Sequence, residues 1–290
     1  MLYGAIEAGG TKFVCSVGNK EYQTLDKISI ETTDPKETLK QVIHFFNKYK
    51  EQVSSFGIGS FGPIDCDKNS PTYGFITNTP KLLWKDFDVL GTLKSEFNVP
   101  MYWTTDVNAS AYGEYHFGHG EDLSSLVYVT IGTGVGGGAI QNGEFIGGAS
   151  HPEMGHMIVH PHSSATQGGI CPYHDFCLEG LACGPAIEHR AGIKGNDLEP
   201  ESVEWEIEAY YIAQAVYNIT YLLRPERVIL GGGVMNKESL LEKVQESYQK
   251  LAGDYLEIDD IKRYIVLPKL GGEAAVKGCY KLAEKAFNKK

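Results

Sequence analysis

The chain has 290 residues with 26 Lys and Arg against 37 Asp and Glu, so its formal net charge is −11. This acidic balance argues against nucleic acid or an anionic membrane surface as a partner. No apolar run approaches the ~20 residues that a membrane-spanning helix needs. The N-terminus shows neither the basic region nor the cleavage site of a secretory signal peptide. The six cysteines are scattered, which is typical of a reduced, cytoplasmic protein without a disulfide framework.

The first half of the chain alternates strands and helices. Two strands joined by a glycine turn fill residues 2–17, and a third strand is expected over 21–30. A helix is predicted over 35–49, because apolar residues recur at helical spacing after an Asp34 N-cap and Pro35. The remaining expected elements are a strand in FGIGSFGPID, an irregular stretch over 66–88, a helix over 89–97, the strand MYWTT and a helix starting at Asp106.

The same pattern restarts near residue 119 with strand, glycine turn, strand, tight turn and strand. An irregular stretch over 150–178 follows, and then come helices over 184–191, 202–223 and 237–251, strands at RVILGGGV and 264–267, and a last helix after Gly271-Gly272. The repeat predicts two α/β domains, an N-terminal domain over 1–117 and a C-terminal domain over 118–290. The last helix is a segment that could pack back on the N-terminal domain.

Three apolar strands end in glycine turns, which together suggest a nucleotide site. The turns are Gly9-Gly10-Thr11-Lys12, Gly132-Thr133-Gly134 and Gly231-Gly232-Gly233. Backbone N–H groups of two facing turns could hold the β- and γ-phosphates, and the third turn would let an adenosine lie against the backbone. The alternative is three unrelated turns, for which glycine is equally suited.

In their order along the chain, these turns and the segments between them resemble the ROK family of sugar kinases. The matching segments are EAGGTK and TIGTGVGGG for the phosphates, GIGSFGPID and TDVNASAYGE near the sugar, HPEMGHMIV and CLEGLACGPAI for the family signature, and VILGGGV for adenosine. The resemblance implies a two-domain actin-like (ribonuclease H-like) ATPase fold with a cleft between the domains, ATP with Mg²⁺, and a homodimer. Within the family, the chain is most similar to bacterial zinc-containing fructokinases.

Asp106 is the candidate catalytic residue. It follows a strand and opens a helix, a position where a carboxylate can also serve only as an N-cap. The resemblance gives it the role of general base, which takes the sugar hydroxyl proton as the oxygen attacks the γ-phosphate. Thr105 stands where relatives have an Asn at the sugar. Glu7 stands where many relatives have Asp, so we expect it to contact Mg²⁺ through water.

A polar stretch over 151–180 contains closely spaced cysteines and histidines. Three candidate ligands lie within seven residues, Cys171, His174 and Cys177, whereas Zn²⁺ normally takes four ligands. By spacing alone the fourth could be His151, His156, His160 or His162. The resemblance selects His156, although C-x2-H-x2-C departs from the usual C-x-C-x4-C pattern of the family. We expect a structural zinc, because four protein ligands leave no position for the water of a zinc hydrolase; the alternative is a reduced Cys pair without metal.

The resemblance also places residues at the sugar. Besides Thr105 and Asp106 these are Gly62, Asn78, Glu153, His156 and Glu179. Carboxylates suit sugar hydroxyls, because each carboxylate accepts hydrogen bonds from two of them. The expected reaction is ATP-dependent phosphorylation of a hexose, with D-fructose to fructose 6-phosphate favoured over glucose or mannose. A non-catalytic sugar-binding regulator is the other alternative, but such regulators carry an N-terminal helix-turn-helix, for which a hairpin starting at residue 2 leaves no room.

Overall fold

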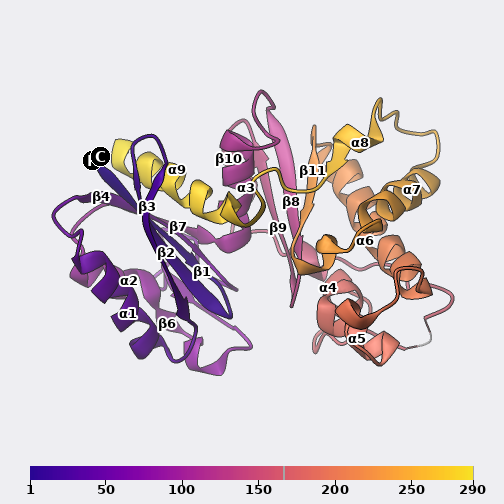
Figure 1. The fold of residues 1–290 in the computed structure, drawn as a ribbon, viewed down its shortest axis with the longest axis horizontal. Coiled ribbons are helices and arrows are strands. Elements are labelled where there is room, and N and C mark those ends of the chain that lie inside the picture. Colours follow the sequence, from indigo (N-terminus) through magenta and orange to yellow (C-terminus); the bar gives the residue numbers. More distant parts are fainter. Residues whose placement is uncertain (166, 290) are drawn as a thin grey trace. The chain divides into compact units, whose positions relative to one another are not determined.

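The structure is a computed structural model that describes residues 1–165 and 167–289. The chain forms two compact units, and each is built around one five-stranded mixed sheet with helices packed on it (Figure 1). The first unit comprises Met1–Glu121, Ile146–His151 and Gly272–Lys290, and the second comprises Asp122–Phe145 and Pro152–Gly271.

The first sheet has the strand order β3-β2-β1-β4-β7. Its strands are β1 Leu2–Ala8, β2 Lys12–Asn19, β3 Thr24–Glu31, β4 Val53–Ser60 and β7 Met101–Thr105. β1 pairs antiparallel with β2 and parallel with β4, which in turn pairs parallel with β7. The carboxyl ends of three parallel strands therefore meet at one edge of the sheet, beside the β1–β2 turn.

Helices cover both faces of this sheet. They are α1 Pro35–Asn47, α2 Val89–Glu96, α3 Asp106–Phe117 and α9 Ala274–Asn288, with the short elements β5 Phe75–Ile76, η1 Leu82–Trp84 and β6 Phe87–Asp88. The predicted N-cap is confirmed, because the Asp34 side chain accepts hydrogen bonds from the N–H groups of Lys36 and Glu37. The helix ends at Asn47, two residues earlier than expected, in a turn closed by a hydrogen bond from Tyr49 N to Phe46 O.

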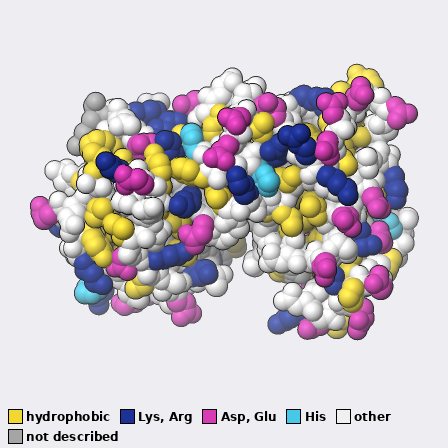
Figure 2. Space-filling view, turned by 45° about the horizontal axis from the view of Figure 1, so that its top comes forward, with side chains coloured by type: hydrophobic (Ala, Val, Ile, Leu, Met, Phe, Trp, Pro, Cys, Tyr) yellow, Lys and Arg dark blue, Asp and Glu magenta, His cyan; other side chains and the backbone are white. Residues whose placement is uncertain are grey.

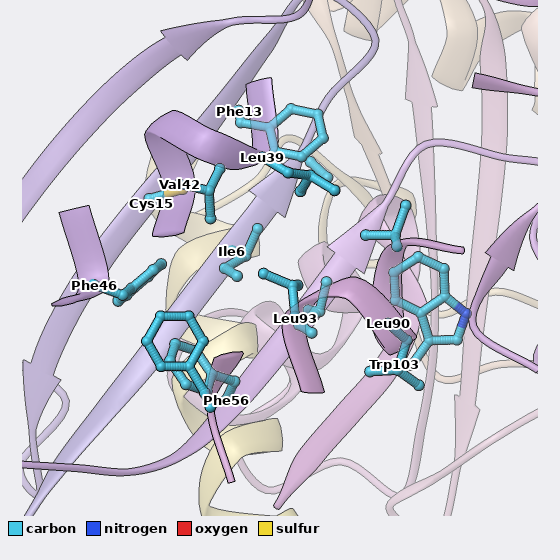
Figure 3. Close-up of a cluster of buried hydrophobic side chains, with 14 of the residues drawn as sticks. Ile6, Phe13, Cys15, Leu39, Val42, Phe46, Phe56, Leu90, Leu93 and Trp103 are labelled. Carbon is cyan, nitrogen blue, oxygen red and sulfur yellow. The ribbon is translucent and has the colours of Figure 1, made fainter. Parts of the chain in front are cut away.

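Strand β4 shows how the two faces of the first sheet differ. Phe56 and Ile58 belong to a buried apolar cluster that includes side chains of α1 and α2, such as Phe46 (Figure 3). Gly57 lies on the other face, where a Cβ atom would stand 1.9 Å from the backbone oxygen of Cys279 on α9. The alternation of side chains along a strand thus buries β4 on both faces, which explains its continuous apolar sequence.

The second sheet repeats the plan of the first, with the strand order β10-β9-β8-β11-β12. Its strands are β8 Ser125–Ile131, β9 Val135–Gln141, β10 Glu144–Phe145, β11 Val228–Gly231 and β12 Ile265–Val266. β8 is antiparallel to β9 and parallel to β11, as β1 is to β2 and β4. The repeat that the sequence predicted is therefore present in the structure.

The second unit has longer helices together with several short turns of helix. They are α4 Leu178–Ala182, α5 Gly184–Ala191, α6 Val203–Leu223, α7 Leu240–Ala252 and α8 Ile261–Tyr264, with η2 Met154–His156, η3 Gly195–Asp197 and η4 Gly233–Asn236. The short turn η5 Gly271–Glu273 begins at the last residue of this unit and continues into the first. The helix expected from residue 237 begins at Leu240, because Ser239 has a left-handed φ of 68° that cannot continue a helix. The sequence did not predict α4 or α8, which are only one turn long.

The surface carries charges of both signs. On the face shown in Figure 2, acidic and basic side chains are interspersed among polar and apolar ones. This mixture differs from the basic stripe that a nucleic-acid-binding face presents. Among the described residues, no helix combines the length and the apolar character needed to cross a membrane.

Candidate active site

Two carboxylates lie at the edge of the first sheet where its parallel strands end. Glu7 is the next-to-last residue of β1, and Asp106 directly follows β7 as the first residue of α3. Burial, followed by the neighbouring negative charge of Asp106, raises the pKa of Glu7 to about 7, while Lys27 and Lys12 act in the opposite direction. A cation at this edge would relieve the repulsion between the two carboxylates.

The start of helix α3 is capped by the residue before Asp106. The Thr105 hydroxyl oxygen accepts a hydrogen bond from Asn108 N at 3.1 Å, so Thr105 is the N-cap. The alternative that Asp106 serves only as the N-cap is therefore wrong. Asp106 Oδ1 accepts from Val107 N at 2.8 Å, which orients the half-buried carboxylate at the start of the helix. Thr105 itself is almost completely buried, with its oxygen committed to the cap.

The turn between β1 and β2 is compact and partly exposed. Gly9 N donates to Lys12 O at 3.0 Å, and a Cβ atom at Gly9 would stand 2.8 Å from that same oxygen. Thr11 and Lys12 are exposed at the tip. A second lysine lies over this turn, because a Cβ atom at Gly10 would stand 3.0 Å from Lys81 Cε. The turn thus has two ammonium groups nearby, one of which the sequence did not predict.

Two further residues expected at the sugar lie on loops of the first unit. Gly62 follows β4, and the imidazole of His151 lies beside it, with Nε2 accepting a hydrogen bond from Ile64 N at 3.3 Å. Asn78 is exposed in the loop after β5. His151 is therefore placed near Gly62 and does not join the other histidines of the 151–180 stretch.

Two of the three predicted glycine turns meet in the second unit. A Cβ atom at Gly132 would stand 3.9 Å from Gly233 N, and Gly132 O accepts a hydrogen bond from Gly184 N at 2.7 Å. Gly232 adopts a φ of 91°, and a Cβ atom there would stand 2.3 Å from the backbone oxygen of Ile131. Only glycine fits this position, since both the backbone angle and the space exclude a side chain.

A cavity of about 660 Å³ opens beside these turns, within the range of sites for drug-sized ligands. Its lining includes Gly132, Thr133, Gly184, Trp205, Gly233 and Lys237. The Lys237 ammonium lies 4.8 Å from the centroid of the Trp205 ring, a cation–π contact. The sequence predicted Gly132, Thr133 and Gly233 at the nucleotide but not Gly184. It also did not predict Trp205 or Lys237, because only the fold brings the start of α6 and the end of η4 to the same cavity.

The predicted metal ligands come together in one cluster. The ligand atoms of His156, Cys171, His174 and Cys177 all lie within 4.8 Å of one another. Cys171 Sγ stands 3.9 Å from His156 Nδ1 and 3.7 Å from His174 Nδ1. Burial raises the pKa of the Cys177 thiol to about 11, so a bound cation would be needed to hold it as a thiolate.

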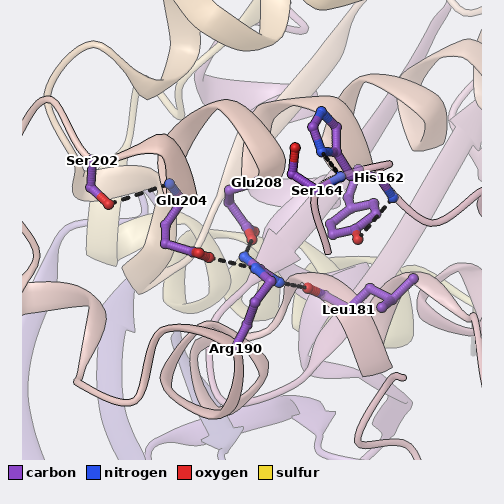
Figure 4. A network of polar contacts seen from close by, with 8 residues as sticks. His162, Ser164, Leu181, Arg190, Ser202, Glu204 and Glu208 are labelled. Atoms are coloured by element: carbon purple, nitrogen blue, oxygen red, sulfur yellow. Dashed lines mark hydrogen bonds and ion pairs between the residues drawn. The ribbon is translucent and has the colours of Figure 1, made fainter. Parts of the chain in front are cut away.

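The other two histidines of the stretch have different partners. His160 N donates to the Gln214 side chain at 2.8 Å. His162 N donates to the Tyr211 hydroxyl at 3.2 Å, and His162 Nδ1 accepts from Ser164 N at 3.2 Å (Figure 4). Of the four histidines that spacing left open, the fold brings His156 to the cysteines.

The two acidic residues expected at the sugar differ in their surroundings. Glu153 is exposed and immediately precedes η2, the turn that carries His156. Glu179 lies in the first turn of α4, and its Oε2 accepts a hydrogen bond from Val135 N at 2.9 Å. Glu179 therefore contacts the glycine turn that joins β8 to β9.

Comparison with known proteins gives consistent matches over nearly the whole chain. A model described as the ROK family matches residues 3–286. The chain is 50% identical over 288 residues to a fructokinase from Streptococcus mutans, with 98% of both chains covered. It is 46% identical over 293 residues to a fructokinase from Lactococcus lactis subsp. cremoris, with 100% of this chain and 99% of that protein covered.

The fold is matched as well. The ROK hexokinase from Thermus thermophilus superimposes with a TM-score of 0.80 over 100% of both chains, at 23% sequence identity. A likeness at this identity shows the fold, which confirms the expected two-domain actin-like architecture. Since the family model spans nearly every residue and full-length relatives share about half of the sequence, the chain belongs to the ROK family.

Proposed function

We propose that the chain transfers the γ-phosphoryl group of ATP to D-fructose and forms fructose 6-phosphate. The observation that carries this proposal is the 50% identity, over nearly the full length of both chains, with a fructokinase. The geometry agrees with the proposal in two respects. A carboxylate pair stands at the carboxyl edge of the first sheet, and a cavity of nucleotide size opens beside glycine turns of the second.

Asp106 acts as the general base in this reaction. Its carboxylate accepts the proton of the sugar hydroxyl as that oxygen forms a bond to the γ-phosphorus. The bond from the γ-phosphorus to the β–γ bridging oxygen breaks, and ADP leaves. Helix α3 favours the ionised form of Asp106, because the carboxylate lies in its first turn and accepts from Val107 N.

The carboxylate pair also fits a hydrated divalent cation. When bound, Mg²⁺ would supply positive charge against the phosphates of the nucleotide. Glu7 would hold the hydrated ion, because its carboxylate is repelled by a second one, Asp106, and a cation would relieve that repulsion.

The His/Cys cluster fits Zn²⁺. Two cysteine sulfurs and two imidazoles are a donor set that zinc binds tetrahedrally in structural sites. All four donors come from the protein, so the metal would stabilise the loop and the start of α4 and take no part in phosphoryl transfer.

The remaining site residues follow the same proposal. The nucleotide would contact Gly9, Gly10, Thr11, Lys12, Gly132, Thr133, Gly134, Gly231, Gly232 and Gly233, and fructose would contact Gly62, Asn78, Thr105, Glu153, His156 and Glu179. The homodimer and the cytoplasmic location stay predictions.

Coupled ADP release tests the proposal directly. The purified protein is assayed with Mg·ATP and either fructose, glucose, mannose, N-acetylmannosamine or no sugar. We expect kcat/KM for fructose to exceed that for each other sugar, and release without sugar to stay at background. Turnover that is absent with fructose but present with another hexose would support sugar-kinase activity but overturn fructose as the substrate. If no sugar gave turnover, both parts of the proposal would be wrong.

A further inference from the structure

We infer that Glu179 is a positioning residue for the nucleotide, because it holds the turn Gly132–Val135 in place through the N–H of Val135. This role is additional to the sugar contact proposed above, and the inference rests on the proposed function. The ligand concerned is the phosphate chain of a nucleoside di- or triphosphate, which would lie against the turn at the mouth of the cavity.

The contact between Glu179 and the turn is direct. Glu179 Oε2 accepts from Val135 N at 2.9 Å, and the acceptor is a carboxylate, which makes a stronger hydrogen bond than a neutral oxygen. A Cβ atom at Gly134 would stand 2.7 Å from the same oxygen. The carboxylate therefore lies against the backbone of the turn, and glycine at position 134 leaves the room for it.

The turn is also held at its other end by the same part of the chain. Gly132 O accepts from Gly184 N, the first residue of α5, at 2.7 Å. Helices α4 and α5 are separated by a single residue, Cys183. One short corner of the chain thus contacts both ends of a turn that lines the cavity through Gly132 and Thr133.

Helix α4 is fixed at both of its ends, which makes it a rigid support. Its N-cap is Cys177, whose sulfur accepts from Gly180 N at 3.4 Å and belongs to the His/Cys cluster. Near its other end, Leu181 O accepts from Arg190 Nη1 at 2.7 Å (Figure 4). Arg190 is buried and paired with two carboxylates of α6, Glu204 at 2.6 Å and Glu208 at 3.2 Å.

This arrangement has a consequence for binding that a sugar contact alone would not have. A carboxylate that only touched sugar would leave nucleotide affinity unchanged when the sugar is absent. A carboxylate that holds the phosphate turn must change nucleotide affinity even then, because its loss frees the turn and leaves the Val135 N–H without its acceptor.

The test is ADP binding by isothermal titration calorimetry without sugar. We expect Glu179→Ala to weaken ADP binding by about tenfold. Glu179→Gln keeps an oxygen that can accept from Val135 N, so ADP affinity should stay within about threefold of wild type. The exposed Glu246→Gln is the matched control for loss of one negative charge on the second unit, and should leave ADP affinity unchanged.

A double-mutant cycle with Gly134→Ala approaches the same contact from the other side. The added methyl group would displace the Glu179 carboxylate, so Gly134→Ala should weaken ADP binding in the wild-type background and have little further effect in Glu179→Ala. Equal losses in both backgrounds, or unchanged ADP affinity in Glu179→Ala, would overturn the inference. Thermal melting of each variant identifies any that fails to fold; if Glu179→Ala does, unchanged ADP affinity in Gly134→Ala would overturn the inference.

The inference and the proposed function can fail separately. If the wild type binds ADP but phosphorylates no sugar, the proposed function is wrong and the calorimetry still decides the role of Glu179. If it phosphorylates fructose and Glu179→Ala binds ADP normally, the inference alone is wrong. A wild type that does not bind ADP would overturn both.

Discussion

Asp106 is the residue on which the proposed chemistry depends most directly. Asp106→Asn keeps the size of the side chain and an oxygen that can accept from Val107 N, but removes the base. We expect kcat to fall by about 10²- to 10⁴-fold, the usual contribution of a general base. Affinities for fructose and ADP should change by no more than about threefold. Steady-state kinetics and calorimetry measure these quantities, with the exposed Asp254→Asn as the matched control; near-normal turnover would remove Asp106 as the base.

Glu7 should give the activity a pH dependence near neutrality. Its pKa is raised to about 7 by burial and by the charge of Asp106, so its carboxylate takes up a proton as the pH falls through 7. A protonated carboxyl holds a hydrated cation poorly. The ionised fraction of a group with this pKa falls about tenfold between pH 8 and pH 6, and kcat/KM for Mg·ATP should fall by a similar factor.

Two measurements separate Glu7 from other titrating groups. Glu7→Gln should lower kcat/KM for Mg·ATP and flatten its profile between pH 6 and 8. In the wild type, raising the concentration of free Mg²⁺ should move the fall in kcat/KM to lower pH, because the cation competes with the proton for Glu7. A Gln variant that keeps the wild-type profile would show that another group is responsible.

At the residue scale, the sequence predicted residues whose signal is local and missed those placed by tertiary contacts. The glycine turns and Asp106 are marked by their positions after apolar strands. Lys81 lies over Gly10, and Lys237 over Trp205, only because the fold brings distant segments together. The sequence left open whether Asp106 serves only as an N-cap, because Thr105 and Asp106 both suit that position and side-chain geometry decides between them.

At the element scale, the His/Cys loop and helix α4 can be tested with one substitution. Cys177→Ser removes a sulfur ligand and puts in its place a hydroxyl oxygen that can still cap α4. Any loss of thermal stability then reflects loss of the metal and not loss of the cap. We expect about one zinc per chain in the wild type, less in the variant, and a melting temperature lower by several degrees. Elemental analysis and calorimetry make these measurements.

The control for that substitution is a cysteine outside the cluster. Cys66 is half-buried in the first unit, and Cys66→Ser should leave the metal content unchanged. If Cys177→Ser retained a full equivalent of zinc, Cys177 would not be a ligand. If the wild type contained no zinc after growth with the metal, the cluster would be a set of reduced side chains.

Elements with a strong periodic pattern were predicted well, and the one-turn helices α4 and α8 were not. The helix over 202–223 has a long apolar pattern and was placed within one residue of α6. Helix α4 has only five residues, too few for a periodic signal, and it lies at the end of a stretch predicted to be irregular. Its position depends on contacts with Arg190 and the His/Cys cluster, which no local pattern records.

At the scale of the whole molecule, the repeated strand order of the two sheets was visible in the sequence as a repeated order of strands and turns. The last helix was expected as a segment that could pack back on the N-terminal domain. Helix α9, the last element of the chain, packs on β1, β4 and α3 of the first unit. Its apolar face predicts a buried helix, and the close approach of glycines to its backbone decides where it lies.

Gly57→Ala should therefore destabilise the whole first unit. The added Cβ atom would stand 1.9 Å from the backbone oxygen of Cys279, and a backbone oxygen cannot move aside as a flexible side chain can. Overpacking of this kind costs about 2 kcal/mol or more, because strand β4 and helix α9 must separate. Gly148→Ala is the matched control, since its Cβ atom would meet nothing within 4 Å.

Gly57→Ala and Gly148→Ala each add a single methyl group to the wild-type protein, so the midpoints of their unfolding can be compared directly. Trp84 and Trp103 both lie in the first unit, and their fluorescence reports its unfolding, while Trp205 is in the second. Both variants are made in a Trp205→Phe background, so that the fluorescence comes from the tryptophans of the first unit. We expect Gly57→Ala to unfold at a lower denaturant concentration than Gly148→Ala. Equal midpoints for Gly57→Ala and Gly148→Ala would mean that α9 does not pack against β4 as closely as the structure shows.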